Sequence, residues 1–189
     1  YTANPLEAAM ALTQLRKFDS VTSKIQERGR FLTSELKRRF PWVIPPEEAS
    51  NTTAVYHFYR IKFSPSFYTH KQDGRFRKAI QDALDAEGLN VRHYQNIPVS
   101  GQIIFREKKA YGKGLPWSLD ENQMNYDIKA YPGALDVIRN TVVLGAISSA
   151  PGYLLCEGTI EKYLEGFKKI DENMDEIIAY ANKLDYRDP

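Results

Sequence analysis

The chain opens with YTANPLEAAMALTQLRKFD (residues 1–19), which carries the start signals of a helix. Asn4 is a good N-cap, because its side-chain oxygen can accept a hydrogen bond from a free N–H of the first turn. Pro5 suits the first helical position, where no backbone N–H is needed. Glu7 follows the cap at the spacing of a capping box. These residues predict that a helix begins at residue 5.

The helical pattern continues far beyond this stretch. No proline interrupts it before Pro41, so residues 5–40 form one helix or two helices with a bend. At ~1.5 Å per residue, a single helix of this length spans roughly 54 Å, more than a small domain needs. We therefore expect the helix to serve more than one domain. Its apolar residues recur at helical spacing: Leu6, Met10, Phe18, Val21, Ile25, Leu32 and Leu36.

Composition limits the class of protein. The 189 residues are 42% hydrophobic and 26% charged, as in one ordinary globular domain with an appendage. The net charge of +2 is too small to favour bulk binding to nucleic acid or a membrane surface. No apolar run is long enough to span a membrane. The single Cys156 excludes an intramolecular disulfide and a cysteine-based zinc site, so we expect a reduced, cytoplasmic environment.

The charge is uneven along the chain. Residues 60–113 hold 11 basic and 5 acidic side chains, whereas residues 157–189 hold 5 basic and 9 acidic ones. The basic middle segment is either a solvated surface or the side that faces an anionic ligand.

The remaining pattern predicts an α+β fold. It consists of a small, three-stranded, antiparallel sheet covered on one face by helices, with the long helix in front. The predicted strands are residues 55–63, 89–95 and 141–147. The predicted helices are residues 75–88, with Asp73 as the cap, and residues 157–183; residues 134–140 form a short helix or a turn. Residues 41–54 read as a connector and residues 96–132 as a long loop.

One candidate site lies in VRHYQNIP, residues 91–98, where a strand ends in a proline-bearing loop. Strand alternation places Arg92 and Tyr94 on one face and His93 on the other. Arginine can hold a carboxylate or phosphate bidentately, and tyrosine can stack and donate a hydrogen bond. An edge arginine and a half-buried tyrosine are also common in sheets without any ligand, so both interpretations stay open.

A second candidate is FREKKAYGKGLPW, residues 105–117. It has four cationic side chains, two glycines and a tryptophan, and could close over an anionic substrate. It could also be an RNA-binding loop or a plain surface loop. Its basic and aromatic residues alternate too sparsely for nucleic-acid binding to be expected.

Other side chains give no catalytic pattern. His57, His70 and His93 are far apart in the sequence and have no metal-ligand spacing, so no metal site is predicted. His57 falls within a predicted strand and is interpreted as structural, and His70 as solvated. Ser20 and Lys24 are expected on a solvent-facing side of the long helix. No phosphate-binding glycine motif or nucleophile elbow occurs.

Three segments together resemble the DegT/DnrJ/EryC1/StrS family of sugar aminotransferases. NPLEAAMALTQLRKFD resembles the helix that follows the family's cofactor lysine, through Ala8, Ala9, Gln14, Leu15 and the pair Phe18-Asp19. The stretch from Gly88 to Pro98 resembles a family strand and its proline-bearing loop. YPGALDVIRNTVVLG, followed by an acidic helix, resembles the C-terminal ending. The resemblance covers all 189 residues but only the last half of such a protein.

The resemblance implies that residues 1–40 link to a large domain upstream and that residues 41–189 form the small C-terminal domain. It explains a chain that enters a helix so early. Family members carry pyridoxal phosphate on a lysine of the large domain and transfer an amino group, typically from glutamate, to a nucleotide-linked keto-sugar. The resemblance therefore implies no catalytic residue in this chain, an inactive fragment, a homodimer, and a small-molecule substrate contacted by Arg92, His93 and Tyr94.

The sequence also departs from the family pattern. Thr2 stands where many members have arginine, and Ser100 where many have histidine, while residues 144–151 lack histidines found in some members. The parent could therefore be a non-sugar member, a dehydratase or a regulator. The alternative function is a stand-alone α+β module that binds an anionic ligand, such as a nucleotide or RNA. That module would have a packed first helix and a basic groove around Arg106 to Lys113.

Overall fold

A computed structural model of the chain describes residues 4–64, 73–119, 124–145 and 152–189. Its described part contains a four-stranded antiparallel sheet in the order β1-β2-β4-β3. The strands are β1 (Val43–Ile44), β2 (Tyr59–Phe63), β3 (Val91–Arg92) and β4 (Thr141–Leu144). The antiparallel α+β architecture is confirmed, but the expected count of three strands is wrong. The extra strand β1 has only two residues and lies between two prolines. It is therefore too short to show the alternation that predicts a strand.

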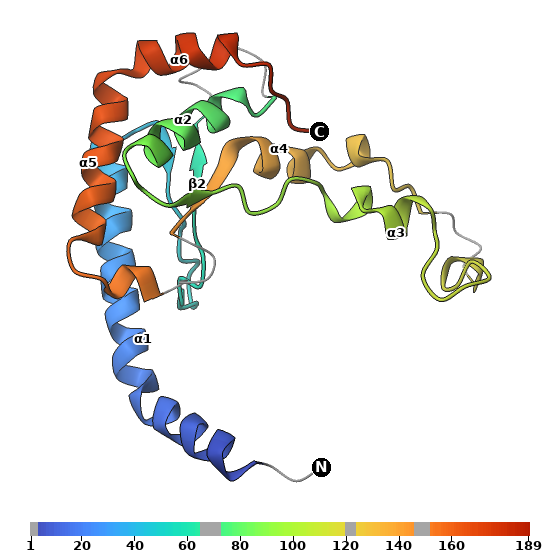
Figure 1. Cartoon of the computed structure of the whole chain (residues 1–189), viewed down its shortest axis with the longest axis horizontal. Helices are drawn as coiled ribbons and strands as arrows, with labels where there is room; N and C mark the ends of the chain where they lie inside the picture. Colours follow the sequence, from blue (N-terminus) through green and yellow to red (C-terminus); the bar gives the residue numbers. More distant parts are fainter. Residues whose placement is uncertain (1–3, 65–72, 120–123, 146–151) are drawn as a thin grey trace.

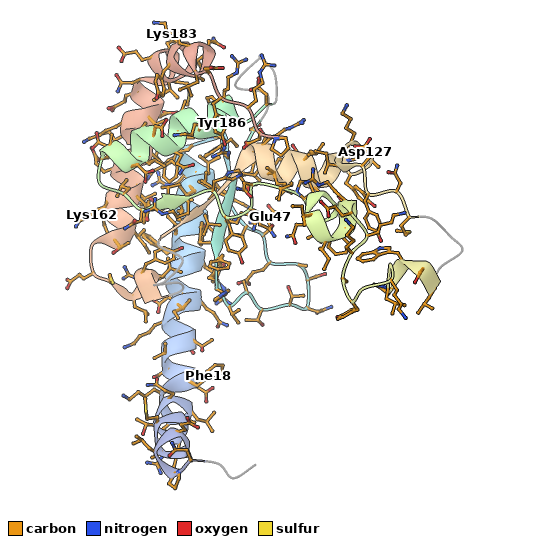
Figure 2. The ribbon with its side chains drawn as sticks, turned by 45° about the vertical axis from the view of Figure 1, so that its right-hand side comes forward. Phe18, Glu47, Asp127, Lys162, Lys183 and Tyr186 are labelled. Carbon is orange, nitrogen blue, oxygen red and sulfur yellow. The ribbon has the colours of Figure 1, made fainter. Side chains whose placement is uncertain are left out.

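Helix α1 (Pro5–Arg39) is a single unbroken helix. As predicted, the Asn4 side chain caps it by accepting a hydrogen bond from the Leu6 N–H at 3.0 Å. Its second half is built into the domain, whereas every described residue from position 4 to position 21 is exposed. Figure 1 shows the first half projecting away from the body, and Figure 2 shows Phe18 on this projecting part.

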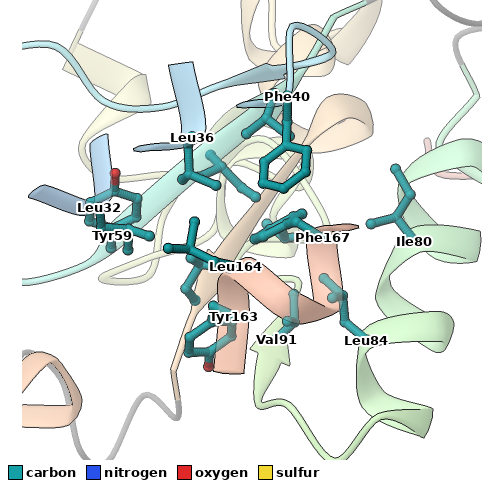
Figure 3. Packing of buried hydrophobic residues seen from close by; sticks show 14 of the residues in the cluster. Leu32, Leu36, Phe40, Tyr59, Ile80, Leu84, Val91, Tyr163, Leu164 and Phe167 are labelled. Atoms are coloured by element: carbon teal, nitrogen blue, oxygen red, sulfur yellow. The ribbon is translucent and has the colours of Figure 1, made fainter. Parts of the chain in front are cut away.

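The main core lies between one face of the sheet and helices α1, α2 (Arg75–Ala86) and α5 (Thr159–Glu172). On β2, Tyr59, Ile61 and Phe63 are buried and alternate with half-buried Arg60 and Lys62, as period-two alternation requires. Figure 3 shows side chains from the sheet and from the three helices meeting around Phe167.

The second face of the sheet is also covered, contrary to the expectation of helices on one face only. Helix α4 (Pro132–Asn140) lies on this second face. Its position is shown by the ion pair between Asp136 and Lys62, since the Lys62 side chain points away from the main core. Figure 1 shows α4 on the side of β2 opposite to α1 and α5. Residues 134–140, which were predicted as a short helix or a turn, are helical, and α4 leads directly into β4.

Several predicted boundaries were too long. Strand 55–63 is regular only from Tyr59, because Tyr56 adopts a left-handed backbone conformation with φ of 47°. Strand 89–95 shrinks to Val91–Arg92, and strand 141–147 is regular through Leu144, with residues 146–147 outside the described part. The predicted helix 157–183 is two helices, α5 and α6 (Met174–Lys183), which are separated at Asn173.

The predicted long loop forms an arm, defined here as residues 97–119 and 124–131. It contains short helical turns: η2 (Val99–Gly101), α3 (Ile103–Arg106), η3 (Trp117–Leu119) and η4 (Ile128–Ala130). In Figure 1 the arm extends sideways from the body. No helix in the described ranges is both long and apolar enough to cross a membrane.

Candidate functional site at the end of strand β3

The three predicted site residues leave β3 in different directions. Arg92 pairs with Val143 of β4, and its guanidinium turns back toward the end of α2. There it donates to Asp85 Oδ1 at 3.3 Å and to Asn90 Oδ1 at 3.0 Å. Arg92 is therefore open to solvent but already has a carboxylate partner.

Tyr94 is the most open of the three, with 42% of its surface exposed. Its ring lies against Phe58, with ring centroids 4.7 Å apart, and the guanidinium carbon of Arg60 lies 5.8 Å from its centroid. Neither Phe58 nor Arg60 was predicted as a site residue. The alternation of Tyr59 and Ile61 into the core would have placed both on the opposite face, but it did not indicate that Tyr94 would meet them.

His93 is held between α4 and the C-terminal segment. Its Nε2 lies 3.0 Å from the Ile138 carbonyl, and its Nδ1 lies 3.9 Å from Asp188 Oδ1. Because a carbonyl only accepts, Nε2 carries the proton in the neutral ring. Burial, together with the Arg77 and Arg60 charges, lowers the pKa of His93 below its ordinary value, and the Asp188 carboxylate opposes this only in part.

The Asp188 carboxylate belongs to a buried ion pair. Asp188 and Arg77 are 2% and 1% exposed, and their closest contact is 3.0 Å. The Tyr186 hydroxyl accepts from Arg77 at 2.6 Å and lies 2.6 Å from Asp188 Oδ1. The Asp188 N–H also donates to the Asp73 carbonyl at 2.8 Å. The C-terminal segment is thus fixed against α2, directly behind β3.

The arm carries a pocket of about 510 Å³ beyond this strand end. Ile97, Gly101 and Ile128 supply apolar lining, and Arg106 and Asp127 supply charges. Gly101 allows close packing there, because a Cβ would lie 2.7 Å from the Ile97 side chain and 2.8 Å from the Ile128 side chain. Tyr126 lines the pocket as well and belongs to an aromatic cluster that holds the arm together. In that cluster, Trp117 Nε1–H donates to the Tyr126 hydroxyl at 2.8 Å, and Phe105 packs against both rings.

The cationic stretch 105–117 contributes to this pocket only in part. Arg106 and Lys108 line it, whereas Lys109 reaches Glu107 at 3.5 Å. A neighbouring apolar pocket of about 330 Å³ is lined by Phe105, Tyr131 and Ser100, among others. The Ser100 hydroxyl oxygen is buried and has no hydrogen-bond partner among the described residues. The arm therefore offers a mixed surface that could take a ligand with apolar and charged parts.

The other side chains singled out by sequence lie elsewhere. His57 was expected inside a strand, but it precedes β2, is exposed, and contacts Phe58 with centroids 4.2 Å apart. The Ser20 hydroxyl donates to the Lys17 carbonyl at 3.0 Å on the exposed half of α1. His70 lies outside the described residues.

The described residues do not form a pyridoxal phosphate site. A Schiff-base lysine needs a sheltered position, and every described lysine is exposed or half-buried. The half-buried Lys62 and Lys78 are engaged by Asp136 and Asp82. Over the same ranges, no group of three or more histidine, cysteine or acidic side chains is arranged to hold a metal ion.

Comparisons with known proteins identify the family. The sequence model of the DegT/DnrJ/EryC1/StrS aminotransferase family matches residues 2–133. No curated protein matches the chain. Among solved structures, a putative sugar aminotransferase from Streptococcus pneumoniae in its apo form is similar over 91% of this chain and 35% of its own, with 15% identity and a TM-score of 0.62.

Two further structures are similar in the same way. An aminotransferase from Streptoalloteichus hindustanus is 15% identical over 92% of this chain and 38% of its own, with a TM-score of 0.59. A DegT DnrJ EryC1 StrS aminotransferase from Brucella abortus is 16% identical over 84% of this chain and 33% of its own, with a TM-score of 0.57. These likenesses show a shared fold, and the chain spans about a third of the length of each structure. Because the family match extends over most of the sequence, this chain belongs to the DegT/DnrJ/EryC1/StrS aminotransferase family.

Proposed function

We propose that this chain is the C-terminal part of a pyridoxal-phosphate-dependent aminotransferase that transfers an amino group from glutamate to a nucleotide-linked keto-sugar. Residues 1–40 link to the large domain, and residues 41–189 form the small domain. The protein works in the cytoplasm as a homodimer. The family match is the support for the reaction class, and the apolar surface of α1 is the structural observation that carries the domain assignment.

The projecting half of α1 has the surface of a helix that is covered in the whole protein. Leu6, Met10 and Leu15 are 68%, 63% and 69% exposed, and Phe18 is 58% exposed. At 100° per residue, Leu6, Met10 and Phe18 continue the apolar stripe of the buried half of α1, and Leu15 widens it to about half of the helix surface. An exposed apolar surface of this width marks a contact, so we assign this half to contact with the large domain.

The open end of β3 and the arm supply the substrate contacts in this proposal. Tyr94 offers an exposed ring and hydroxyl, and Arg92 sits beside it on the strand. The His93 ring contacts the Ile138 carbonyl of α4, so His93 orients the strand end and does not point toward a ligand. The arm pocket, with Arg106 on an apolar base, suits a polar ligand that carries a negative charge.

Pyridoxal phosphate supplies the electron sink for amino-group transfer when it is bound in the large domain. The residues of this chain bind and orient the substrate and help to exclude water from the closed site. Since the described lysines offer no sheltered position for the cofactor, we expect the 189-residue chain to be inactive by itself.

The stand-alone anion-binding module is less well supported. It requires a self-contained surface in which the first helix is packed, and the exposed half of α1 does not fit that requirement. The arm does carry the expected cations, but Glu107 and Asp127 lie among them. This balance gives no extended basic groove of the kind that nucleic acid needs.

The test begins with the genomic DNA before the Tyr1 codon. We expect an in-frame upstream segment that encodes a large domain with the cofactor lysine. The product of the longer frame, loaded with pyridoxal phosphate, should release more than one equivalent of 2-oxoglutarate per cofactor from glutamate only when a nucleotide-linked keto-sugar accepts the amino group. The triple variant Leu6→Gln/Met10→Gln/Leu15→Gln should lower this activity by loosening the domains. A frame that opens at Tyr1, or a longer product that never turns over, would refute the proposal.

A further inference from the structure

Three arginines lie near the end of β3, and two of them have carboxylate partners. Arg77 is paired with Asp188 inside the protein, and Arg92 is paired with Asp85 at the surface. For Arg60, no carboxylate or hydrogen-bond partner occurs in the ranges that the structure describes. Its guanidinium carbon lies over the Tyr94 ring, 5.8 Å from the centroid. Among the described residues, Arg60 is therefore the charge of this group that has no carboxylate partner.

The position of Arg60 is fixed by the strand that carries it. Its neighbours Tyr59 and Ile61 are both fully buried in the main core, so the Arg60 side chain must leave the opposite face of β2. Half-buried there, it lies over the Tyr94 ring, and Phe58 contacts the same ring. The guanidinium is thus held on an aromatic support rather than free in solvent.

The contact with Tyr94 leaves the hydrogen-bond donors of the guanidinium available, because an aromatic ring attracts the cation without accepting its N–H groups as a carboxylate does. Those donors form a fork that fits two oxygens of one carboxylate or phosphate. Partial burial strengthens such a pair relative to one in open water.

The surrounding charge favours an anion at this point. Arg60 and Arg92 both pair across the sheet with Val143, so their backbones are two strand spacings apart, about 10 Å. Asp85 offsets Arg92, Asp188 offsets Arg77, and Asp136 on the same face is engaged by Lys62. Burial is the main cause of the lowered pKa of His93, and the Arg77 and Arg60 charges add to it.

We propose that Arg60, held over the Tyr94 ring, binds an oxyanion group of a small ligand, either a carboxylate or a phosphate, through two parallel N–H donors. The site lies on the second face of the sheet and is distinct from the cationic arm. It requires neither the large domain nor the cofactor, so it can be tested independently of the proposed aminotransferase function.

The experiment titrates the 189-residue chain with inorganic phosphate and, separately, with succinate, at constant ionic strength. Arginine Nε–H and histidine ring signals are followed by NMR. We expect saturable shifts at Arg60 and His93 with either or both probes. Saturation by phosphate alone assigns the site to a phosphate-bearing ligand, saturation by succinate alone assigns it to a carboxylate, and saturation by both shows that it accepts either group.

Variants separate this site from general attraction to a basic surface. Arg60→Gln should weaken binding about tenfold or more, because the charged donor is lost. Arg60→Lys should weaken it less, because the charge stays while the fork is lost. Arg16→Gln, at an exposed arginine on α1, is the matched control and should leave the affinity unchanged.

Tyr94→Leu provides a second route if Arg60→Gln fails to fold. It removes the aromatic support and keeps the charge, and it should weaken binding severalfold. The proposal is overturned if neither probe binds, if Arg60→Gln or Tyr94→Leu binds as tightly as the natural chain, or if Arg16→Gln abolishes binding.

Discussion

At the residue scale, ion pairs hold the structure around the end of β3. The Arg77–Asp188 pair is almost fully buried, and each member makes further hydrogen bonds that a single partner would not satisfy. Burying two charges is costly unless their geometry is good and their remaining donors and acceptors are used. His93 sits beside this pair, and its burial, together with the Arg77 charge, lowers its pKa. Two predictions follow from these contacts.

Asp188→Asn should destabilise the fold strongly, because it leaves the Arg77 charge buried without its counter-charge. Breaking a buried pair in this way costs about 3 to 5 kcal/mol of unfolding free energy. Urea denaturation of the purified chain measures the change. Glu47→Gln, which breaks the exposed pair with Lys37, is the control and should hardly alter the midpoint. Equal losses in the two variants would show that burial is not the cause.

The stability of the chain should fall as the pH drops from 7 toward 5. The pKa of His93 is lower in the folded chain than its ordinary value of 6.5, so the unfolded chain takes up the proton first. The stabilisation is complete above the unfolded pKa, and it is lost as the pH falls from that value through the lower folded pKa.

His93→Gln should reduce this pH dependence, since the glutamine amide can still donate to the Ile138 carbonyl but does not titrate. His57→Gln, at an exposed ring, should leave the dependence unchanged. Urea midpoints at several pH values provide the comparison. A His93→Gln profile that overlays the natural one would contradict the assignment.

At the element scale, α1 and the segment before β2 are fitted to each other at a glycine. A Cβ on Gly29 would lie 2.6 Å from the Tyr56 ring. The ring cannot retreat easily, because Tyr56 already has a φ of 47°, stacks on Tyr59, and holds its hydroxyl 3.3 Å from Glu48. The close approach of helix and ring therefore sets the depth at which α1 lies in the core.

Gly29→Ala should destabilise the protein although alanine is the better helix former. The steric cost of overpacking, about 1–3 kcal/mol, exceeds the gain of about 1 kcal/mol in helix propensity. Gly133→Ala in the first turn of α4 is the matched control, because nothing lies within 4 Å of its added Cβ. Thermal unfolding should show opposite signs for the two variants, or no change for the control. A stabilised Gly29→Ala would disprove the packing argument.

The elements differ in how well their bounds can be predicted from the sequence. Helix α1 was predictable to within a residue, because Asn4 and Pro5 start it and no proline interrupts it before Pro41. The break between α5 and α6 was not predictable, since the apolar spacing from Ile170 to Met174 continues across it without glycine or proline. Asn173 leaves helical geometry there with φ of −120°, and α6 then packs against α2, so tertiary contacts decide this break.

The candidate site was predictable only in part for the same reason. Alternation along a strand says which side chains share a face, but not which strands become neighbours. Arg92, His93 and Tyr94 stood out because they are adjacent in the sequence. Arg60 and Phe58 reach Tyr94 across the sheet, through β4, which enters the sheet some 80 residues after β2.

At the scale of the whole molecule, the chain consists of a packed body and two projections. The body holds the sheet, the helices around it and the second half of α1. The projections are the first half of α1 and the arm, and both expose large apolar side chains; on the arm, Ile103, Tyr111 and Leu119 are 64%, 85% and 78% exposed. Stability should therefore depend on the body, and association on the projections.

The triple variant Leu6→Gln/Met10→Gln/Leu15→Gln should leave the unfolding free energy of the 189-residue chain within about 0.5 kcal/mol, because these side chains contact solvent. Leu32→Ala on the same helix should cost about 2–5 kcal/mol, since Leu32 is fully buried. Urea unfolding of both variants gives the contrast. If the triple variant is as unstable as Leu32→Ala, the first half of α1 contributes to the body.

The unbroken α1 also has a mechanical consequence. At ~1.5 Å per residue, Asn4 lies about 30 Å along the axis from Ile25, where the buried part begins. Because the helix is continuous, a small rotation of the body about the Gly29–Tyr56 contact moves the N-terminal end of α1 by several ångströms. A spin label at position 8 would register movements of the small domain that are too slight to detect within the domain itself.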